Sequence, residues 1–271
     1  MSIKNVFVIG AGRMGLPIIG HLVRRGFSVS VHDLNSSKQA AAEAAGASWG
    51  GDPALLAASA DVVLVCVGYD REVRELLQEG GALSHAPAGA IVAILSTVSP
   101  RTMQELAEQA ATRGLHVIDS TVCRGGEAAD RGTLLSFVGG PAETVERVTP
   151  VLRAYSADVV HTGAAGSAQV AKAVNNLILW ACLVADHEGL ALAQRYGMDV
   201  EVLRKALLIS SCSNGPLEKW GTQSMAWAED DMAIVAEMAT AAGIGLPLCG
   251  VVREVCRPLK PRRYQLDRYG A

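Results

Sequence analysis

The segment Val6-Phe-Val-Ile-Gly10-Ala-Gly12-Arg13-Met14-Gly15 decides the fold of the first half of the chain. An apolar run typical of a β-strand ends in three glycines spaced as Gly-x-Gly-x-x-Gly, and a helical pattern follows. The first glycine permits a tight turn, the second lets a pyrophosphate approach the backbone, and the third allows the helix to pack closely on the strand. Unpaired N–H groups at the start of the helix attract phosphate. We therefore predict that Gly10, Gly12, Arg13, Met14 and Gly15 bind a dinucleotide.

A second strand pattern, Ser28–His32, runs directly into Asp33, which lies 18 residues beyond Gly15. A carboxylate at this place accepts hydrogen bonds from the hydroxyls of the adenosine ribose and repels a 2′-phosphate. The sequence therefore favours NAD over NADP as the cofactor. The segment Ser36-Ser37-Lys38 follows at once and could still contact a phosphate, so NADP stays open.

Apolar runs alternate with helical patterns up to residue 163, which is typical of a parallel sheet covered by helices. After that the strand signals stop, and Ser167–Tyr196 forms one long apolar helical pattern. We predict an α/β fold in which a doubly wound Rossmann-type parallel sheet domain (residues 1–163) is linked by a long helix to an all-helical substrate and dimerisation domain (residues 164–271). The predicted strands are Asn5–Ile9, Ser28–His32, Val62–Val67, Ala90–Leu95, His116–Asp119, Leu134–Val138 and Asp158–His161.

The composition excludes several classes of partner. With 271 residues, half of them hydrophobic, and a formal net charge of −3, the chain suits neither nucleic acid nor an anionic membrane. Nothing resembles a secretory leader, and no run of about 20 unbroken apolar residues is present, so we expect a cytoplasmic protein. The six cysteines lack metal-site spacing, and no metal is predicted. His187 is expected to be a packed helix residue, and the basic, proline-broken segment 257–263 a mobile tail.

Three further motifs follow the glycine-rich segment in order: Ser96-Thr97-Val98-Ser99-Pro100, then Asp119-Ser-Thr-Val-Cys123-Arg124-Gly125-Gly126, and finally Gly163-Ala-Ala-Gly166-Ser-Ala-Gln-Val-Ala-Lys172-Ala-Val-Asn175-Asn176. Together they resemble the β-hydroxyacid dehydrogenase family, which includes 3-hydroxyisobutyrate dehydrogenase and tartronate semialdehyde reductase and is related to 6-phosphogluconate dehydrogenase. The resemblance covers nearly the whole chain.

The resemblance implies roles for several residues. Lys172 and Asn176 lie four apart on a predicted helix and therefore share one face. The family's matching lysine handles the proton of the substrate hydroxyl, the matching asparagine orients that hydroxyl, and Asn175 would support the site. Val67 and Thr97, at or just after strand ends, are the further expected cofactor contacts. The family also implies a homodimer or a larger assembly, with the active site between the domains.

The chain departs from the family at two places. Cys123 stands where a substrate-binding serine is expected, and Arg124 replaces a glycine. A lysine that the family carries near the start of its next-to-last long helix is absent from Glu229-Asp-Asp-Met232. Because a thiol is a weak donor and a guanidinium can bind an anion through two hydrogen bonds, we expect Arg124, together with Cys123 and Gly125, to bind the substrate's anionic group.

These features predict a dehydrogenase that transfers a hydride between NAD(P)(H) and the β-carbon of a small anionic 3-hydroxy or 3-oxo acid, a carboxylate or a phosphonate analogue, with Lys172 as proton donor or acceptor. Two alternatives remain. One is a non-catalytic dinucleotide-binding redox regulator, which the Lys172 and Asn176 pair disfavours. The other is a decarboxylating dehydrogenase of the 6-phosphogluconate type, which has a much longer C-terminal domain.

Overall fold

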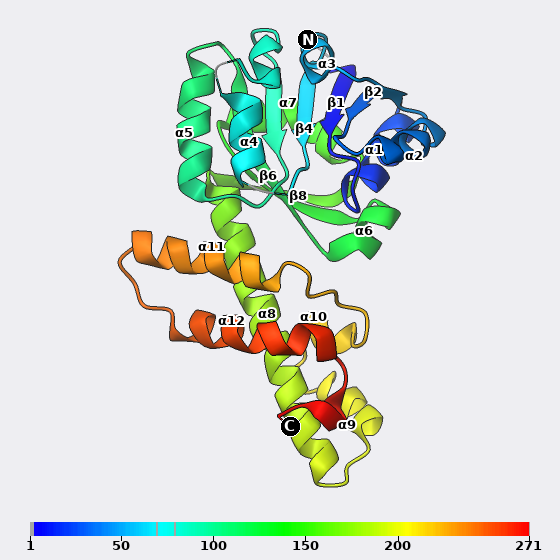
Figure 1. Ribbon diagram of the computed structural model, residues 1–271, viewed down its shortest axis with the longest axis vertical. Coiled ribbons are helices and arrows are strands. Elements are labelled where there is room, and N and C mark those ends of the chain that lie inside the picture. The colour runs from blue at the N-terminus through cyan, green and yellow to red at the C-terminus, as the bar shows by residue number, and fades with distance from the viewer. Residues whose placement is uncertain (1–2, 69, 79, 271) are drawn as a thin grey trace. The chain divides into compact units, whose positions relative to one another are not determined.

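The computed structural model describes residues 3–68, 70–78 and 80–270, and the chain divides into two compact units, Met1–Lys172 and Ala173–Ala271. In the first unit the described residues form one eight-stranded sheet with helices on both faces (Figure 1). Its strands are β1 (Asn5–Ile9), β2 (Ser28–His32), β3 (Ser48–Trp49), β4 (Val62–Val65), β5 (Ile91–Ile94), β6 (His116–Cys123), β7 (Leu134–Gly139) and β8 (Ser156–Gly163). Its helices are α1 (Gly15–Arg24), α2 (Gln39–Ala44), α3 (Pro53–Ala57), α4 (Asp70–Leu77), α5 (Pro100–Ala111), α6 (Gly125–Arg131) and α7 (Ala142–Leu152).

The order of the strands is β3-β2-β1-β4-β5-β6-β7-β8, which is the doubly wound arrangement predicted from the sequence. Strands β1 to β6 are parallel, whereas β7 runs antiparallel to β6 and β8 is parallel to β7. Alternate residues of β4 enter two different cores: Val62 and Leu64 pack with α1 and α7, and Val63 and Val65 pack with α4 and α5. A strand that is covered on both faces has to be apolar throughout.

All seven predicted strands are present, and the ends of β4, β5, β7 and β8 differ from the predicted ends by one or two residues. Strand β6 continues to Cys123, four residues beyond the predicted end. The prediction stopped at Asp119 because Ser120 and Thr121 are polar, yet both are fully buried. The short strand β3 and the helices α3 and α6 were not predicted. Helix α6 has seven residues and begins with two glycines, so it lacks the repeated apolar spacing that indicates a helix.

The second unit is helical. It contains most of α8 (Ser167–Arg195), followed by α9 (Val200–Leu207), α10 (Gly215–Glu218), α11 (Ala228–Ala241) and α12 (Pro247–Leu259). Trp180 and Leu183 of α8 pack with Met232 of α11 and Val252 of α12. Helix α8 is long and apolar enough to cross a membrane, but the core helix of a soluble protein meets the same two criteria. The buried His187, with hydrogen bonds at both ring nitrogens, is in keeping with a core helix.

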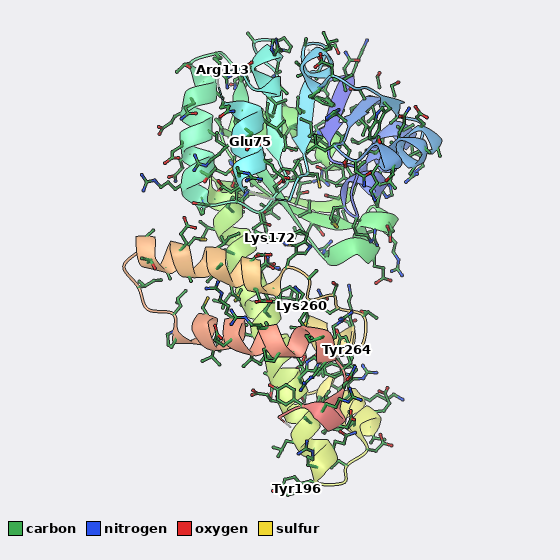
Figure 2. The ribbon with its side chains drawn as sticks, viewed as in Figure 1. Glu75, Arg113, Lys172, Tyr196, Lys260 and Tyr264 are labelled. Atoms are coloured by element: carbon green, nitrogen blue, oxygen red, sulfur yellow. The ribbon has the colours of Figure 1, made fainter. Side chains whose placement is uncertain are left out.

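The prediction of a mobile tail after residue 257 is wrong. Helix α12 continues to the buried Leu259, and Leu266 is buried as well. The backbone N–H of Tyr264 donates to Nε2 of His187 at 2.9 Å, while Nδ1 of His187 lies 2.7 Å from the carbonyl of Leu183 (Figure 2 labels Tyr264). Burial lowers the pKa of His187, so the neutral ring that this arrangement requires is favoured. Apolar side chains between the basic ones anchor the segment, and the basic side chains concealed that pattern in the sequence.

Candidate active site

The glycine-rich loop between β1 and α1 has room for a phosphate at one glycine and none at the other two. Gly10 has a φ of +98°, and a Cβ there would lie 2.2 Å from the carbonyl oxygen of Cys66. A Cβ on Gly15 would lie 2.0 Å from the carbonyl oxygen of Gly10, whereas one on Gly12 would meet nothing within 4 Å. At the start of α1 the N–H of Leu16 donates to the carbonyl of Gly12 at 3.1 Å and Pro17 has no N–H, so a phosphate would have to bind the N–H groups of the turn that precedes them. The loop therefore fits a pyrophosphate at Gly12.

The residue beneath this loop does not add a negative charge. Burial, and to a smaller extent the charge of Asp33, raises the pKa of the Cys66 thiol to about 11. A protonated thiol at neutral pH does not repel a phosphate. The backbone carbonyl of Cys66 therefore closes the space behind Gly10, and its thiol adds no charge there.

Asp33 lies at the end of β2, where the sequence predicted a ribose contact. Its Oδ2 accepts the N–H of Ala11 at 2.7 Å, and its Oδ1 accepts the N–H of Asn35 at 2.8 Å. A carboxylate has about four acceptor sites, so each oxygen keeps a lone pair for a hydroxyl donor. The two backbone hydrogen bonds fix the carboxylate next to the glycine-rich loop, which fits a ribose diol.

The side chain of Arg13 connects the glycine-rich loop to α6. Its Nη1 and Nη2 donate to the two carboxylate oxygens of Asp130 at 2.7 and 2.6 Å, and a Cβ on Gly126 would lie 2.6 Å from Nη2. The guanidinium is thus paired in this structure, but because both side chains are more than half exposed, the pair would open for a phosphate at a cost of at most about 1 kcal/mol. Both the side chain of Arg13 and the main chain of Arg13 and Met14 are therefore candidates for phosphate contacts.

The first turn of α8 is attached to β6 by buried hydrogen bonds. Asp119, which is fully buried, accepts the N–H of Gly166 at 2.9 Å and that of Gln169 at 3.0 Å. Burial raises the pKa of Asp119, and the backbone N–H donors act in the opposite direction. Thr121 Oγ1 donates to the carbonyl of Ala168 at 3.0 Å. Together these bonds fix the start of the helix that carries Lys172.

Lys172 points back at the end of the same strand. Its Nζ donates to the carbonyl of Val122 at 2.8 Å and lies 3.9 Å from Cys123 Sγ (Figure 2 labels Lys172). An ammonium has three N–H donors, so the bond to Val122 leaves donors for a substrate oxygen. Asn176 follows one turn later on α8 and is buried, and its Oδ1 accepts Nδ2 of Asn175 at 3.0 Å. The structure thus brings Lys172 and Cys123 together, with Asn176 on the same helix face as the lysine.

The predicted cofactor contacts Val67 and Thr97 are connected to α8 by two side chains that the sequence analysis missed. Ser96 Oγ donates to the carbonyl of Val67 at 2.8 Å and accepts the N–H of Val67 at 3.0 Å. Gln169 donates through Nε2 to the carbonyl of Ser96 at 2.9 Å and accepts the N–H of Val98 at 3.0 Å. The available signal was Gln169 itself, a polar residue three positions before Lys172.

Arg124 does not lie free beside Lys172. Its Nη2 binds Oδ2 of Asp158 at 2.7 Å, and its Nη1 donates to the carbonyl of Thr133 at 3.2 Å. The backbone of Arg124 has a φ of +85°, in the left-handed region that favours glycine, and the next residue, Gly125, has a φ of +75°. Binding of a substrate anion by Arg124 would require its pair with Asp158 to open. Because both side chains of that pair are about half exposed, opening it costs at most about 1 kcal/mol.

The missing lysine at the start of α11 is replaced by residues with structural partners. The buried Asp231 accepts Nε1 of Trp180 at 2.8 Å, and Glu229 binds Arg257 at 3.2 Å. These carboxylates stabilise the contacts of α11 with α8 and α12.

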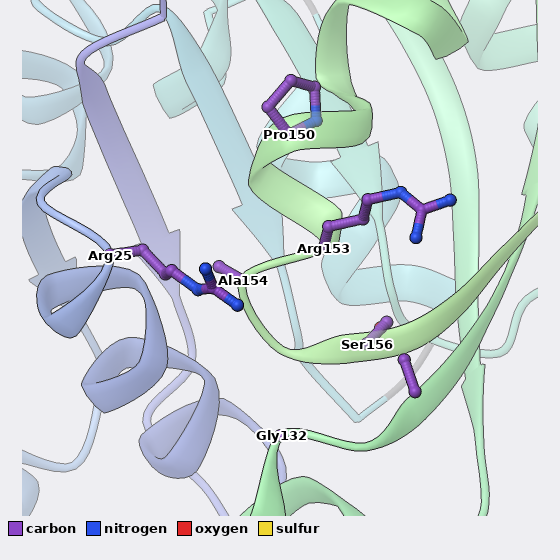
Figure 3. Close-up of a pocket in the computed structure, with 7 residues that line it drawn as sticks. Arg25, Gly132, Pro150, Arg153, Ala154 and Ser156 are labelled. Carbon is purple, nitrogen blue, oxygen red and sulfur yellow. The ribbon is translucent and has the colours of Figure 1, made fainter.

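Two pockets lie away from the predicted site residues. One, of about 390 Å³, is lined by Arg25, Gly132, Arg153 and Ser156 among others (Figure 3). The other, of about 580 Å³, lies along α8 at Cys182 and Asp186. Arg25 and Arg153 follow the last turns of α1 and α7, where a cation offsets the negative end of each helix dipole. Within residues 3–68, 70–78 and 80–270 no group of three or more His, Cys, Asp or Glu side chains could hold a metal ion.

Two protein-family models together match nearly the whole chain. Residues 5–163 match the NAD binding domain of 6-phosphogluconate dehydrogenase, and residues 166–267 match the NAD-binding model of NADP-dependent 3-hydroxyisobutyrate dehydrogenase. The chain belongs to the β-hydroxyacid dehydrogenase family. It is accordingly an NAD(P)-dependent oxidoreductase that acts on CH–OH groups, as the sequence predicted.

Individual relatives agree with this assignment. The chain is 34% identical over 216 residues to an NAD-dependent L-serine dehydrogenase of Pseudomonas aeruginosa, covering 79% of this chain and 72% of that protein. It is 34% identical over 215 residues to a 3-hydroxyisobutyrate dehydrogenase of the same organism, again covering 79% and 72%. The fold matches that of a Mycobacterium tuberculosis 3-hydroxyisobutyrate dehydrogenase with L-serine, with a TM-score of 0.88 at 23% identity over 100% of both chains.

Proposed function

We propose that this β-hydroxyacid dehydrogenase prefers NAD(H) and oxidises a small 3-hydroxy acid, with Lys172 managing the hydroxyl proton. The observation that supports this most is the placement of Lys172 Nζ at the end of β6, 2.8 Å from the carbonyl of Val122 and beside Cys123. When bound, the nicotinamide supplies the hydride acceptor or donor. Lys172 would donate a proton to the forming alkoxide in reduction and accept it in oxidation. Asn176, on the same helix face, would orient the hydroxyl, supported by Asn175.

The substrate class can be tested with a panel. Small 3-hydroxy acids, including L-serine and 3-hydroxyisobutyrate, which are named in relatives or their structures, would be incubated with NAD⁺ or NADP⁺ while absorbance of the reduced cofactor is followed. We expect saturable reduction of NAD⁺ with at least one 3-hydroxy acid and none with its deoxy analogue. Failure of the entire panel would contradict the proposed substrate class.

The preference for NAD rests on Asp33. Its carboxylate, fixed by Ala11 and Asn35, would accept the ribose hydroxyls and repel a 2′-phosphate. We expect Asp33→Ala to weaken NADH binding more than NADPH binding, which can be measured by fluorescence titration of both cofactors. Lys38→Ala is the companion variant, because it removes the adjacent cation. Tighter binding of NADPH than NADH by the parent would contradict the assignment.

The anionic group of the substrate would be bound by the loop Cys123–Gly126. We propose that Arg124 exchanges Asp158 for the substrate, with the N–H groups of Gly125 and Gly126 as additional donors. Arg124→Ala should then lower kcat/KM by about 30- to 1000-fold, which corresponds to a loss of about 2–4 kcal/mol of transition-state binding. Asp158→Ala should leave kcat/KM unchanged or raise it, because it releases the same guanidinium. Equal kcat/KM in the parent and Arg124→Ala would leave the backbone N–H groups as the anion site.

A homodimer or larger assembly remains part of the proposal. Val174, Ile178 and Leu192 on α8 are 51%, 58% and 61% exposed, which is unusual for large apolar side chains of one helix. A second copy that covers them would bury this apolar surface.

The domain division at residues 163 and 164 and a cytoplasmic location also remain predictions.

A further inference from the structure

We propose that Gln169 is a positioning residue that fixes the loops after β4 and β5 relative to Lys172, and so sets the geometry of hydride and proton transfer. This inference rests on the proposed role of Lys172 as the proton donor or acceptor. It assigns Gln169 no contact with the substrate.

The first element of the argument is the way in which Gln169 binds the strand-end loop around Thr97. Its side-chain amide donates to the carbonyl of Ser96 at 2.9 Å and accepts the N–H of Val98 at 3.0 Å. The two bonds flank Thr97, as a peptide group of a neighbouring strand would. Gln169 is 1% exposed, so water does not compete for these groups. The amide therefore fixes the backbone at a predicted cofactor contact.

The second element is the extension of this connection to β4 and to β6. Ser96 Oγ exchanges two hydrogen bonds with the backbone of Val67, the other predicted cofactor contact at this edge. On the opposite side, the N–H of Gln169 donates to the buried carboxylate of Asp119 at 3.0 Å. Hydrogen bonds, partly buried at Val67 and fully buried at Gln169, thus lead without interruption from Val67 through Ser96 and Gln169 to Asp119.

The third element is the distance along α8. Gln169 precedes Lys172 by three residues, which is less than one helical turn, so the two side chains leave neighbouring positions of the helix surface. A shift of the first turn of α8 against β5 would move Lys172 by a similar amount relative to Thr97. A misplacement of about 1 Å can lower a rate by about 100-fold. Gln169 therefore fixes the position of Lys172 relative to Thr97.

The deciding variant is Gln169→Met, which keeps the length of the side chain and removes both polar groups. Each variant would be assayed with saturating NAD⁺ and the panel acid that the parent oxidises fastest, and NADH binding would be titrated without substrate. We expect kcat to fall by about 10- to 100-fold, with little change in KM, and NADH to bind several-fold more weakly. The kinetic isotope effect with the carbinol-deuterated acid should rise. Ser136→Ala is the control, because it breaks the buried hydrogen bond to Ser156 in the same unit.

A merely structural role would give a different result. Gln169→Met would then lower the melting temperature as Ser136→Ala does, while kcat, the isotope effect and the NADH affinity of the folded protein stayed within about threefold of the control. That outcome overturns the proposal. Inactivity of the parent toward the whole panel would defeat the proposed function instead, and the NADH affinity of Gln169→Met would still decide the role of Gln169.

A second variant covers the case in which Gln169→Met does not fold. In Gln169→Glu the protonated carboxyl can still donate to Ser96 and accept from Val98, whereas the ionised form cannot donate. Burial favours the protonated form. We expect the ratio of the variant's kcat to the parent's to rise as the pH is lowered. A ratio near one at every pH fits a carboxyl that stays protonated and keeps both hydrogen bonds, whereas a ratio well below one that does not change with pH overturns the proposal.

Discussion

Lys172→Ala should lower kcat by about 10²- to 10⁴-fold, the range that general acid–base catalysis contributes. The substitution removes the group that would exchange a proton with the substrate hydroxyl, and no described contact of this side chain reaches the glycine-rich loop. The dissociation constant of NADH, measured by fluorescence titration, should therefore stay near that of the parent.

Two further variants separate the chemistry from the packing. Lys172→Met keeps most of the aliphatic stem and removes the ammonium, so a similar loss of kcat in both variants would assign the effect to the ammonium. Lys205→Ala, which removes an exposed lysine of α9, is the control for loss of one positive charge. Near-normal turnover by Lys172→Ala would contradict the proposed mechanism.

Gly12→Ala should weaken NADH binding by about 10- to 100-fold without lowering the melting temperature. A Cβ at Gly12 meets no atom of the protein within 4 Å, so the folded chain tolerates it. The same Cβ would occupy the space through which a pyrophosphate reaches the backbone. Loss of one hydrogen bond to a charged group is worth about 1.5–3 kcal/mol, which gives the expected range.

The contrasting variant is Gly15→Ala. Its Cβ would lie 2.0 Å from the carbonyl oxygen of Gly10, so the start of α1 would have to move. This variant should lose both stability and NADH affinity, as thermal unfolding and the same titration would reveal. If Gly12→Ala bound NADH as tightly as the parent, the phosphate would have to bind away from Gly12.

The centre of the sheet could be predicted because strands such as β4 and β5 are covered on both faces. Runs such as Val62–Val65 are fully buried, which leaves no polar residue to obscure the pattern. The carboxylate of Asp33 at the strand end and the four-residue spacing of Lys172 and Asn176 were equally visible in the sequence. Each of these features depends only on residues that are close together in the sequence, so a local sequence pattern is enough to predict it.

The connections that hold the site together could not be predicted, because their partners are distant in sequence. Asp119 binds Gly166 and Gln169 across 47 and 50 residues, and Gln169 binds Ser96 across 73. Arg124 looked like a free cation, but its partner Asp158 belongs to an edge strand that only the fold places beside it. A polar residue in the sequence gives no sign of the group that will accept its hydrogen bond.

The attachment of Tyr264 to His187 has a consequence for the order in which the protein is made. Ribosomes add about 5–20 residues per second, and domains fold as they emerge. The hydrogen bonds of Lys172 and Gln169 join residues that are all present once residue 172 has been synthesised, whereas His187 must wait for Tyr264, 77 positions further on. During those additional seconds the apolar residues of α8 that α11 and α12 cover in the finished fold stay without that cover, so the second unit completes its core later than the sheet.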